Sequence, residues 1–498
     1  MRAVVVFAHL FPLVVSFLRD RRRWLWRGAP LERSPDFHRR RAERLVANVA
    51  ALGPTWVKLA QVFASRADVV PEPYLAALGT LVDRVPAVPA GTIREEIQAA
   101  FGQPVEALFE RFDEAPLASA SLGQVHRARW HGQEIAVKVL RPGIEALVAQ
   151  DVAAARRLLD LVEPRFPRNP HVRGLRPIVD EFAERIAEEL DLRQEAAYSE
   201  EVRTNFARER RVLIPAIVPE LVQRRVLASV YVEGRRVDAL GDWADRGIVD
   251  PMGVVRTVIE LYVQMMLIDG LFHADPHPGN LLVAPDGRVV LLDFGMVVRV
   301  PVELRRRLIT TVFAGIRRDV DGLVDGFYSL GLVDTEIADR ATVRALIARL
   351  LELAHDDLTG AEKAELVAGE VLRELNGWPI VLPREMVYFA RTAALVEGLG
   401  TRYDRRFNPI LFAGPIALRL RSRVMAALGE PVPSPAEQAL GELVAGLGGF
   451  LGEIAGVVVR AGREIAALVR ERVEFAGATS GEPAPALPPR ALLSAGDD

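Results

Sequence analysis

The chain contains no cysteine among its 498 residues. This absence excludes disulfide bonds, cysteine-ligated zinc and thiol catalysis, and it leaves the redox compartment open. An excess of one charge is also missing, because 63 Lys and Arg face 66 Asp and Glu for a net charge of −3. A general nucleic-acid-binding role is therefore disfavoured, and no nucleic-acid partner is expected.

The N-terminus lacks an apolar run long enough to span a membrane. Residues 3–18 are almost entirely apolar, but they include Pro12 and fall short of the roughly 20 residues that span a bilayer. A signal peptide is not expected, since no basic run precedes them and no clear small-residue cleavage site follows. Residues 1–30 predict an apolar and basic helix. Arginines in 19–27, with Trp24 and Trp26, favour an interfacial position, and a helix packed against protein fits equally well.

Near the C-terminus, residues 441–475 form an apolar region rich in glycine. Three glycines within 443–459 recur at a spacing of four, which on a helix makes a smooth stripe for close helix packing. Glu453 would cost about 2.5 kcal/mol at a bilayer centre, so we interpret this region as membrane-adjacent or helix-packing. Residues 476–498 are rich in Pro, Ala, Gly and Ser and predict a disordered tail.

The intervening chain changes its periodicity once. Residues 31–112 show apolar positions at three and four, as in helices, whereas the pattern from Asp113 predicts a β-hairpin that turns at His131-Gly132. Helices are predicted again over 145–163 and 176–205, followed by paired strands. The predicted domains are an extension over 31–112, a β-rich lobe over 113–235 and a mainly helical lobe over 236–440.

A lysine stands inside an apolar strand, EIAVKVL, in the β-rich lobe. Alternation places Ala136 and Lys138 on one face of this strand and Val137 and Val139 on the other. A lysine buried there is costly unless it meets an anion; the alternative is an edge-strand lysine that reaches water. The downstream sequence favours an anion as the partner of Lys138, because it supplies further parts of a phosphate site.

The stretch 270–297, GLFHADPHPGNLLVAPDGRVVLLDFGMV, carries Asp275, Asn280 and Asp293. In kinase-type phosphoryl transfer, a loop aspartate orients or deprotonates the acceptor. An asparagine five residues later joins the aspartate of Asp-Phe-Gly in holding magnesium, a hard ion that suits these oxygen ligands. The pattern, together with Lys138, predicts a site for ATP and Mg²⁺.

The same stretch also allows a metal-hydrolase interpretation. His273, Asp275 and His277 could begin a zinc or binuclear metal site. The other six histidines are scattered singly, and only His355 lies beside carboxylates. Because this interpretation leaves Asp293 unexplained, we expect His273 and His277 to brace the loop instead.

Four motifs, in order over about residues 35–410, resemble those of the UbiB/AarF family of atypical kinases, also called coenzyme Q accessory kinase-like proteins. These motifs are a Lys-x-Gly-Gln element at Lys58 and Gln61, an alanine-rich nucleotide loop at Ala118, Ser119, Ala120 and Ser121, a Glu-x-Asp element at Glu189 and Asp191, and the set Asp275, Asn280 and Asp293. Two positions depart from the family pattern, because Ala60 replaces a glycine and Ser119 interrupts the alanine run. The hinge also lacks the usual Met-Glu.

The resemblance implies partners for the acidic residues. Glu195 would pair with Lys138, as the helix-C glutamate of kinases does, and Glu189 would meet Lys58. On one helix the two glutamates lie about 120° apart around the axis, so they can serve different partners. Without the motif order, a solvated acidic helix face would be the simpler interpretation.

Further roles follow from the same resemblance. Lys138 would bind the ATP phosphates, and backbone groups of Val230 and Val232 would bind adenine. The expected fold is α+β, a bilobal protein-kinase-like fold with a small β-rich N-lobe, a helical C-lobe and an N-terminal helical extension over the active site. Only MVVRV separates Gly295 from the helix that begins near Pro301, and no Ala-Pro-Glu element follows. Phosphorylation of peptides in trans is therefore not expected.

The leading hypothesis is an ATP- and Mg²⁺-dependent atypical kinase or ATPase. By resemblance alone, it would support isoprenoid quinone biosynthesis or lipid handling at a membrane surface. A lipid or quinone precursor, quinone-biosynthesis enzymes and the membrane would be partners, and the protein would be cytoplasmic and peripheral at the inner face of the cell membrane. The alternative is a catalytically silent nucleotide-binding scaffold for a membrane-associated enzyme complex.

Overall fold

The computed structural model describes residues 2–21, 31–64, 70, 73–81, 86–165, 175–333, 339–355, 384–405, 407 and 409–429. The chain divides into two units, one of residues 1–414 with 423–430 and one of residues 415–422 with 431–498. The elements below belong to the first unit, apart from the middle of helix α19, Pro409–Ala427. The predicted apolar region 441–475 and tail 476–498 lie outside the described residues.

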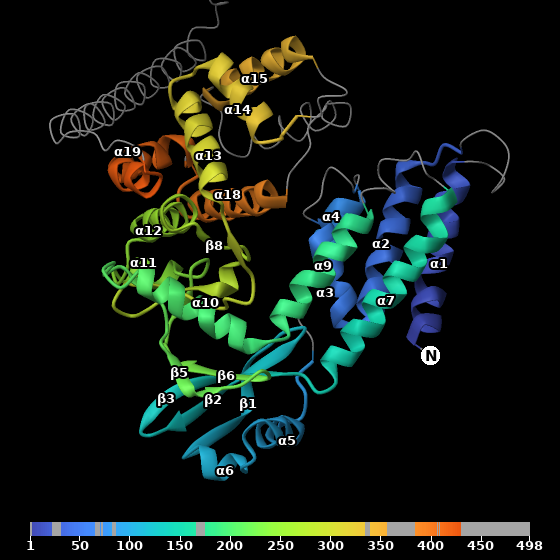
Figure 1. Ribbon diagram of the computed structural model, residues 1–498, viewed down its shortest axis with the longest axis vertical. Coiled ribbons are helices and arrows are strands. Elements are labelled where there is room, and N and C mark those ends of the chain that lie inside the picture. The colour runs from blue at the N-terminus through green and yellow to red at the C-terminus, as the bar shows by residue number, and fades with distance from the viewer. Residues whose placement is uncertain are drawn as a thin grey trace, which may run out of the picture. The chain divides into compact units, whose positions relative to one another are not determined.

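An antiparallel sheet of five strands forms the N-lobe, in the order β1-β2-β3-β6-β5 (Figure 1). Its strands are β1 Arg111–Ser119, β2 Gly123–Trp130, β3 Gln133–Leu140, β5 Ile217–Val222 and β6 Val226–Val230. The predicted hairpin joins β2 to β3, where His131 and Gly132 both have positive φ, 47° and 75°. Such a turn matches the twist of paired strands.

Two short helices, α5 Ala90–Phe101 and α6 Val105–Leu108, share a core with this sheet. Ile93 and Ile97 of α5 pack with the buried face of β3, to which Ile135 belongs. The predicted boundary at residue 112 is therefore misplaced: β1 begins at Arg111, and the last part of the predicted extension packs as part of the N-lobe. Apolar periodicity alone did not show which core these helices would join.

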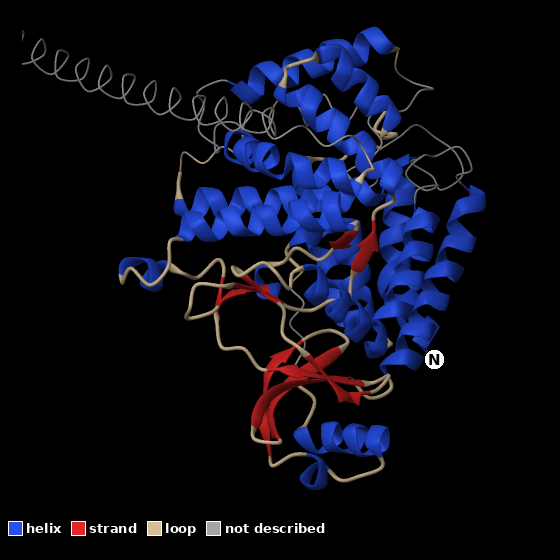
Figure 2. Cartoon of the chain, turned by 60° about the vertical axis from the view of Figure 1, so that its left-hand side comes forward, coloured by secondary structure: helices blue, strands red, loops and turns tan. Residues whose placement is uncertain are grey.

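The remaining extension is a group of helices that pack on one another (Figures 1 and 2). It comprises α1 Arg2–Arg21, α2 Pro35–Leu52, α3 Pro54–Ala64 and α4 Tyr74–Gly79, with α7 Ile144–Val162 and α9 Leu175–Glu189 packed against them and η1 Glu163–Arg165 after α7. Gly53, at φ 94°, ends α2, and Pro54 opens α3 as the sequence predicts. Val6, Leu10 and Leu13 of α1 are buried in the shared core.

The predicted continuous helix over 176–205 is wrong in one respect, because the chain breaks at Leu190 and Asp191. Helix α9 ends at Glu189 and α10 spans Leu192–Asn205. Asp191 adopts an extended conformation, and its side chain caps α10 by accepting a hydrogen bond from the Arg193 N–H at 3.1 Å. The angle of 120° expected between Glu189 and Glu195 on one helix therefore does not apply.

The C-lobe is mainly helical and carries short strands near the N-lobe (Figure 2). Its helices are α11 Gly241–Asp245, α12 Pro251–Val263, the π-helix η2 Gln264–Asp269, η3 Pro278–Asn280, α13 Val302–Ile316, α14 Val320–Ser329, α15 Arg340–His355 and α18 Arg384–Tyr403. Strands β4 Val212–Leu213, β10 Val289–Leu291, β9 Leu281–Val283 and β7 Arg235–Arg236 form one sheet, and β11 Val297–Arg299 pairs with β8 Leu271–His273. These pairings hold the two ends of the stretch 270–297 together.

The described residues include one stretch, Pro251–Asp269, that is long and apolar enough to cross a membrane by length and composition alone. Half of it is buried inside the protein, and α12 packs against α18. A core helix of a globular protein meets the same criterion.

Candidate functional site

Lys138 lies on a central strand of the N-lobe sheet and meets two carboxylates. Its Nζ donates to both oxygens of Glu195, at 2.9 and 2.8 Å, and to Oδ1 of Asp293 at 3.1 Å. Glu195 belongs to the first turn of α10, and Asp293 follows β10 in the C-lobe. The structure therefore brings together residues from three distant segments of the chain. Lys138 contacts anions, as the downstream sequence led us to expect.

Asp293 has an unusual backbone for a residue with a side chain, with φ of 59°. Aspartate is one of the few residue types that visit this left-handed region readily. The N–H of Gly295 donates to Asp293 Oδ1 at 3.1 Å. A Cβ at residue 295 would lie 3.1 Å from the same oxygen, so glycine allows this close approach.

The loop between β8 and β9 carries Asp275 and Asn280. The Asn280 amide donates to the backbone oxygen of Asp275 and to its Oδ2, both at 3.2 Å. His273, which is fully buried, donates from Nε2 to the Asp293 carbonyl at 2.8 Å, and His277 Nδ1 accepts from the Gly279 N–H at 2.9 Å. Both histidines thus bond to the backbone of these loops. Among the described residues, no group of three or more His, Asp or Glu side chains is placed to hold a metal ion.

The donor atoms left over in this loop fit a hard divalent cation. Asn280 uses its amide nitrogen toward Asp275, which leaves its side-chain oxygen without a hydrogen bond from the described residues. Asp293 uses Oδ1 toward Lys138 and Gly295, which leaves Oδ2 in the same state. One carboxylate oxygen and one amide oxygen are ligands that Mg²⁺ takes together with phosphate oxygens and water.

The helical extension reaches the site through Lys58. Its ammonium on α3 forms an ion pair with Glu189 at the end of α9. The Glu189 side chain is only 9% exposed, and its electrostatic neighbours include Asp275 and Asp293, so Lys58 lies close to the predicted acceptor side. Gln61, by contrast, donates to the Leu81 carbonyl at 3.3 Å and contributes to packing inside the extension.

Asp191, the second acid of the Glu-x-Asp element, does not join the cluster. Its carboxylate caps α10 and pairs with Arg193 at 2.6 Å. The hydrogen bonds from Arg193 lower the pKa of this carboxyl. In the structure, Asp191 marks the break between α9 and α10, and Glu195 lies in the first turn of α10.

Burial and charge shift the pKa values of the cluster in different directions. Burial raises the pKa of the Glu195 carboxyl to about 7; Lys138 opposes this shift, and two neighbouring carboxylates add to it. Burial also raises the pKa of Glu189 against the effect of Lys58. Burial disfavours the charged forms of both Lys138 and Asp293. Attraction to neighbouring groups of opposite charge, including each other, outweighs this effect. The pKa of Lys138 therefore lies above its usual range, and the pKa of Asp293 lies below it. Lys138 and Asp293 are therefore charged at neutral pH.

The predicted nucleotide loop is shorter than expected. Ala118 and Ser119 still pair with β2, and only Ala120, Ser121 and Leu122 form the turn before Gly123. Gly123 is required at the end of this turn, because a Cβ there would lie 2.6 Å from the Val139 carbonyl oxygen.

Arg141, which the sequence did not single out, holds this loop in place. Its guanidinium donates to the Ala120 carbonyl at 3.0 Å, to Ser119 Oγ at 2.8 Å and to the Pro86 carbonyl at 2.9 Å. These bonds tie the loop to the end of β3, three residues beyond Lys138.

The residues predicted to contact adenine lie at the end of β6. Val230 is the last residue of this strand and donates its N–H to the Ala216 carbonyl, and Val232 lies in the connection from β6 to β7.

Arg391 is a second residue that sequence reasoning missed. It lies on α18, and its guanidinium contacts Oδ1 of Asp275 at 3.5 Å. Tyr388, one turn earlier on the same helix, donates to Glu181 of α9 at 3.2 Å. Helix α18 therefore touches both the predicted acceptor-side loop and the helix that carries Glu189. No local pattern marks Arg391, because its partner lies more than a hundred residues earlier in the chain.

With this geometry in view, the comparisons decide the family. Residues 80–326 match the model of the ABC1 atypical kinase-like domain. The chain belongs to this family of atypical kinase-like proteins. The resemblance to UbiB/AarF proteins is confirmed, and so is the kinase-like α+β fold.

Relatives of the ABC1 family match most of the chain. Protein sll0095 of Synechocystis sp., named as uncharacterized, is 31% identical over 442 residues, covering 86% of this chain and 76% of that protein. ACTIVITY OF BC1 COMPLEX KINASE 8, a chloroplast protein of Arabidopsis thaliana, is 31% identical over 411 residues, covering 76% of this chain and 54% of that protein. Rv3197 of Mycobacterium tuberculosis, solved in complex with erythromycin, has a TM-score of 0.53 at 24% identity over 76% of this chain and 96% of that chain. The solved structure shows the shared fold alone.

Proposed function

We propose that the chain binds ATP with Mg²⁺ between its two lobes and catalyses phosphoryl transfer from ATP, as an atypical kinase or an ATPase. The observation that carries this proposal is the meeting of Lys138 with Glu195 and Asp293, at 2.8 to 3.1 Å, from three separate elements. Two carboxylates surround this lysine, and Asp293 Oδ2 and the Asn280 side-chain oxygen are available as metal ligands beside it. This combination matches the requirements of a phosphate and metal site.

Each residue has a distinct part in this proposal. Lys138 holds the phosphates as a fixed cation, and Glu195 positions its ammonium. Asp293 Oδ2 and the side-chain oxygen of Asn280 hold Mg²⁺, which when bound neutralises charge on the phosphates. Asp275 orients the acceptor hydroxyl or water and takes its proton. Backbone groups of Val230 and Val232 contact adenine, and Ala118 to Ser121 cover the nucleotide.

The acceptor is a small or lipid-borne molecule, or water, and not a peptide in an open groove. Lys58 supports this choice, because its ion pair with Glu189 places the helical extension next to Asp275 and Asp293. The segment between Gly295 and α13 is also short, and β11 within it pairs with β8. Plant relatives are named for activity of the BC1 complex, which supports a role in isoprenoid quinone biosynthesis or lipid handling for this chain.

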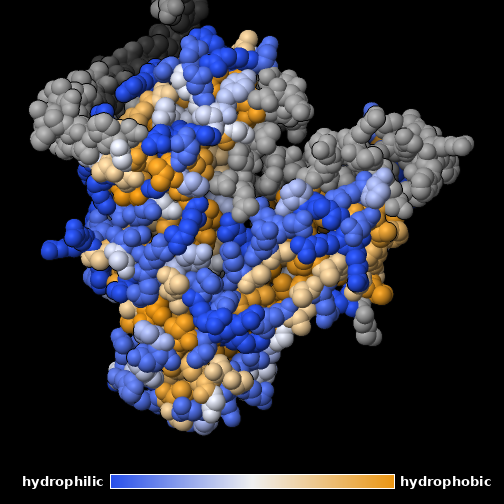
Figure 3. Space-filling model, in the orientation of Figure 1, coloured by the Kyte–Doolittle hydropathy of each residue, from blue (hydrophilic) through white to orange (hydrophobic). Residues whose placement is uncertain are grey.

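The membrane part of the proposal rests on α1. One face of this helix packs on α2 and α7, where Val6 is fully buried, yet the opposite face stays apolar. Val4 is 72% exposed and Phe11 49% exposed, and hydrophobic surface is visible along the edge where α1 runs in Figure 3. Arginines follow this helix in the sequence. An apolar face followed by basic residues favours peripheral binding at the anionic inner face of the cell membrane.

The decisive test is Asp293→Asn, measured as Mg²⁺-dependent ATP turnover with and without anionic liposomes and phenolic quinone precursors. Asparagine tolerates the left-handed backbone at this position, so the variant is expected to fold. We expect a loss of about 100-fold or more in kcat. Asp36→Asn, the same change at an exposed carboxylate on α2, serves as the matched control and should leave turnover unchanged.

Two outcomes would contradict the assignment. Undiminished turnover by Asp293→Asn would remove this residue from the site. Binding of Mg²⁺-ATP by the unaltered protein, seen as a thermal shift, without turnover under any of these conditions would favour the silent scaffold.

A further inference from the structure

Helix α10, which carries Glu195, is attached to both lobes. In Figure 1 it lies between the N-lobe sheet and the helices of the C-lobe. On the N-lobe side, Glu195 bonds to the lysine of β3, and Glu200 accepts a backbone N–H of β5 at 3.2 Å. On the C-lobe side, Glu201 forms an ion pair with Arg299 of β11. The position of Glu195 therefore depends on contacts that this one helix makes with both lobes.

The ion pair between Glu201 and Arg299 is bidentate. Nη1 of Arg299 donates to Oε1 of Glu201 at 3.0 Å, and Nη2 donates to Oε2 at 2.8 Å. Two parallel bonds of this kind fix the orientation of the guanidinium and the carboxylate as well as their distance. Among the described residues, this is the one ion pair that joins α10 to the C-lobe.

The ion pair lies one step along both segments from the candidate catalytic cluster. Glu201 stands six residues after Glu195 on α10, and Arg299 stands six residues after Asp293. Lys138 bonds to both of the earlier residues, and the two later residues bond directly to each other. Strand β11 also pairs with β8, which leads into the loop on the predicted acceptor side. A second connection between α10 and the C-lobe thus accompanies the one through the lysine.

This ion pair is partly open to solvent, so it contributes little to the stability of the fold. The Arg299 side chain is 64% exposed, and the Glu201 side chain is 42% exposed. Exposed pairs are weak, and salt screens them. A weak contact can still matter for alignment, because a displacement of about 1 Å at a catalytic group is enough to slow a reaction.

Protein kinases place their helix-C glutamate by a different route. Phosphorylation of a long activation loop creates pairs between arginine and phosphate, and these pairs control the contact between the lysine and the glutamate. In this chain only residues 296–301 separate Gly295 from α13, which begins at Val302. Within this short segment, Arg299 already has an acidic partner on α10.

We propose that Arg299 and Glu201 are positioning residues, whose ion pair holds α10 in the place where Glu195 meets the lysine of β3. Neither residue touches the nucleotide or the acceptor, and both act through the first turn of α10. The inference rests on the proposed function and specifies how that site is regulated. The segment after Asp-Phe-Gly holds the helix through a built-in ion pair, without a phosphate group.

The first test removes the ion pair from the full-length protein. Arg299→Gln should lower kcat for Mg²⁺-ATP turnover by about two- to fivefold with little change in KM, the size of effect that an exposed ion pair has. Arg299→Lys should retain part of the activity, because it keeps the charge and loses one of the two bonds. Salt screens exposed pairs, so raising NaCl from about 50 mM to about 500 mM should bring the unaltered protein and Arg299→Gln closer together.

Exchange of the two charges separates the ion pair from its individual members. Arg299→Glu places two carboxylates opposite each other and should lower kcat about tenfold, because like charges at this contact push α10 away. Glu201→Arg should have a similar effect through two opposed guanidinium groups. The double variant with both changes restores one charge of each sign and should recover most of the lost activity.

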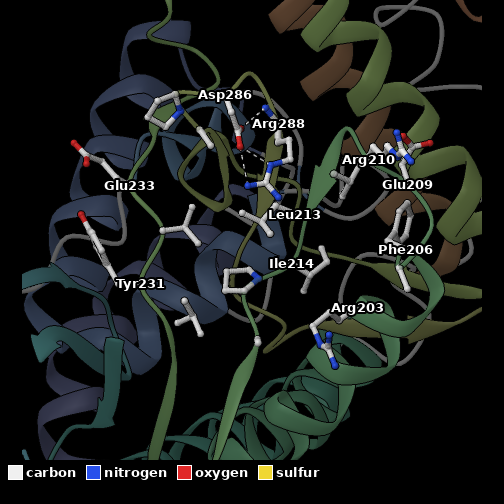
Figure 4. Close-up of a pocket in the computed structure, with 18 residues that line it drawn as sticks. Arg203, Phe206, Glu209, Arg210, Leu213, Ile214, Tyr231, Glu233, Asp286 and Arg288 are labelled. Atoms are coloured by element: carbon white, nitrogen blue, oxygen red, sulfur yellow. Dashed lines mark hydrogen bonds and ion pairs between the residues drawn. The ribbon is translucent and has the colours of Figure 1, made fainter. Parts of the chain in front are cut away.

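Arg203→Gln is the matched control. Arg203 is an exposed residue at the end of α10, beside the hollow behind the hinge that Figure 4 shows. It pairs at 2.8 Å with Glu200 of the same helix, so this ion pair does not connect α10 to another element. We expect kcat to stay unchanged in this variant. Circular dichroism confirms that all variants fold.

Amide hydrogen exchange, followed by mass spectrometry, tests the attachment of α10 without any turnover. Weaker attachment allows more local opening, so exchange in residues 196–202 should be about twofold faster or more in Arg299→Gln. The same residues should exchange at the unaltered rate in Arg203→Gln.

Three kinetic results would overturn the inference. They are undiminished kcat in Arg299→Gln, an equal loss in Arg203→Gln, and a charge-exchanged double variant no more active than either single variant. Absence of turnover in the unaltered protein would contradict the proposed function instead. Hydrogen exchange then decides the inference by itself, and equal exchange in Arg299→Gln and the unaltered protein would exclude it.

Discussion

Two lysine–glutamate pairs meet near the candidate site, and they differ in what surrounds them. Lys138 of the sheet pairs with Glu195 and also with Asp293, whereas Lys58 of the helical extension pairs with Glu189. Both lysines are about equally shielded, with 23% and 22% of their side chains exposed. The comparison shows that burial alone does not separate a phosphate-binding lysine from one that holds two parts of the fold together. The partners of Lys138 come from both lobes, Glu195 of α10 and Asp293 beyond β10, whereas Glu189 ends a helix that packs on α3, the helix of Lys58.

Removing the sheet lysine should have the largest effect. We expect Lys138→Met to lower kcat/KM for Mg²⁺-ATP by about 100- to 1000-fold, because the fixed positive charge on the phosphates is lost. Steady-state ATP turnover measures the change. Lys58→Met serves as the contrasting variant, and an equal loss in both would remove the distinction between the two lysines.

Removing the extension lysine should act first on stability. Lys58→Met leaves Glu189 buried without its cation, and we expect the free energy of unfolding to fall by about 1–3 kcal/mol, since the pair retains some access to solvent. Urea denaturation measures the change. Adding Glu189→Gln should recover part of the loss, because a neutral amide is less costly to bury. A double variant less stable than Lys58→Met would argue against this ion pair as the cause.

Arg391 tests whether the acceptor side depends on a residue outside both pairs. Arg391→Ala should lower kcat about tenfold with little change in KM for ATP, because it frees the Asp275 carboxylate while leaving the nucleotide contacts intact. Arg391→Lys should retain part of the activity. A change in KM alone would indicate instead that α18 acts on nucleotide binding.

The pH profile gives the finest comparison of the two glutamates. The pKa of Glu195 is raised to about 7, and only its ionised form pairs with Lys138. Log kcat/KM should therefore rise with pH up to an inflection near 7 and level off above it, since this parameter reports the free enzyme. Glu195→Gln should remove that inflection while lowering the plateau. Persistence of the inflection in the variant would assign it to another group.

Local patterns account for the parts of the fold that depend on neighbours in the chain. The alternation around Lys138, the turn at His131-Gly132 and the Gly53-Pro54 boundary could all be predicted, because each depends on backbone preferences of adjacent residues. The helix break at Asp191 carried a usable signal, since aspartate is a preferred N-cap. It was masked by the helical periodicity on both sides.

Contacts between distant segments could not be predicted in this way. Arg391 on Asp275, Arg141 on the nucleotide loop and Gln61 on the Leu81 carbonyl join residues without any common periodicity. Long polar side chains reach many partners, and only the packing of helices and sheet selects among them. The packing of α5 and α6 on the sheet, which moved a domain boundary, has the same origin.

The sequence by itself determined the family, the kinase-like fold and the order of the residues that form the candidate site. Motif residues at short spacings carry this information because phosphate and metal chemistry restricts their types. Only the tertiary structure decided that Lys138 has two carboxylate partners, that Lys58 pairs with Glu189 beside the acceptor side and that Arg391 of α18 contacts Asp275. These facts depend on distances between elements far apart in the chain, and such distances are set by packing.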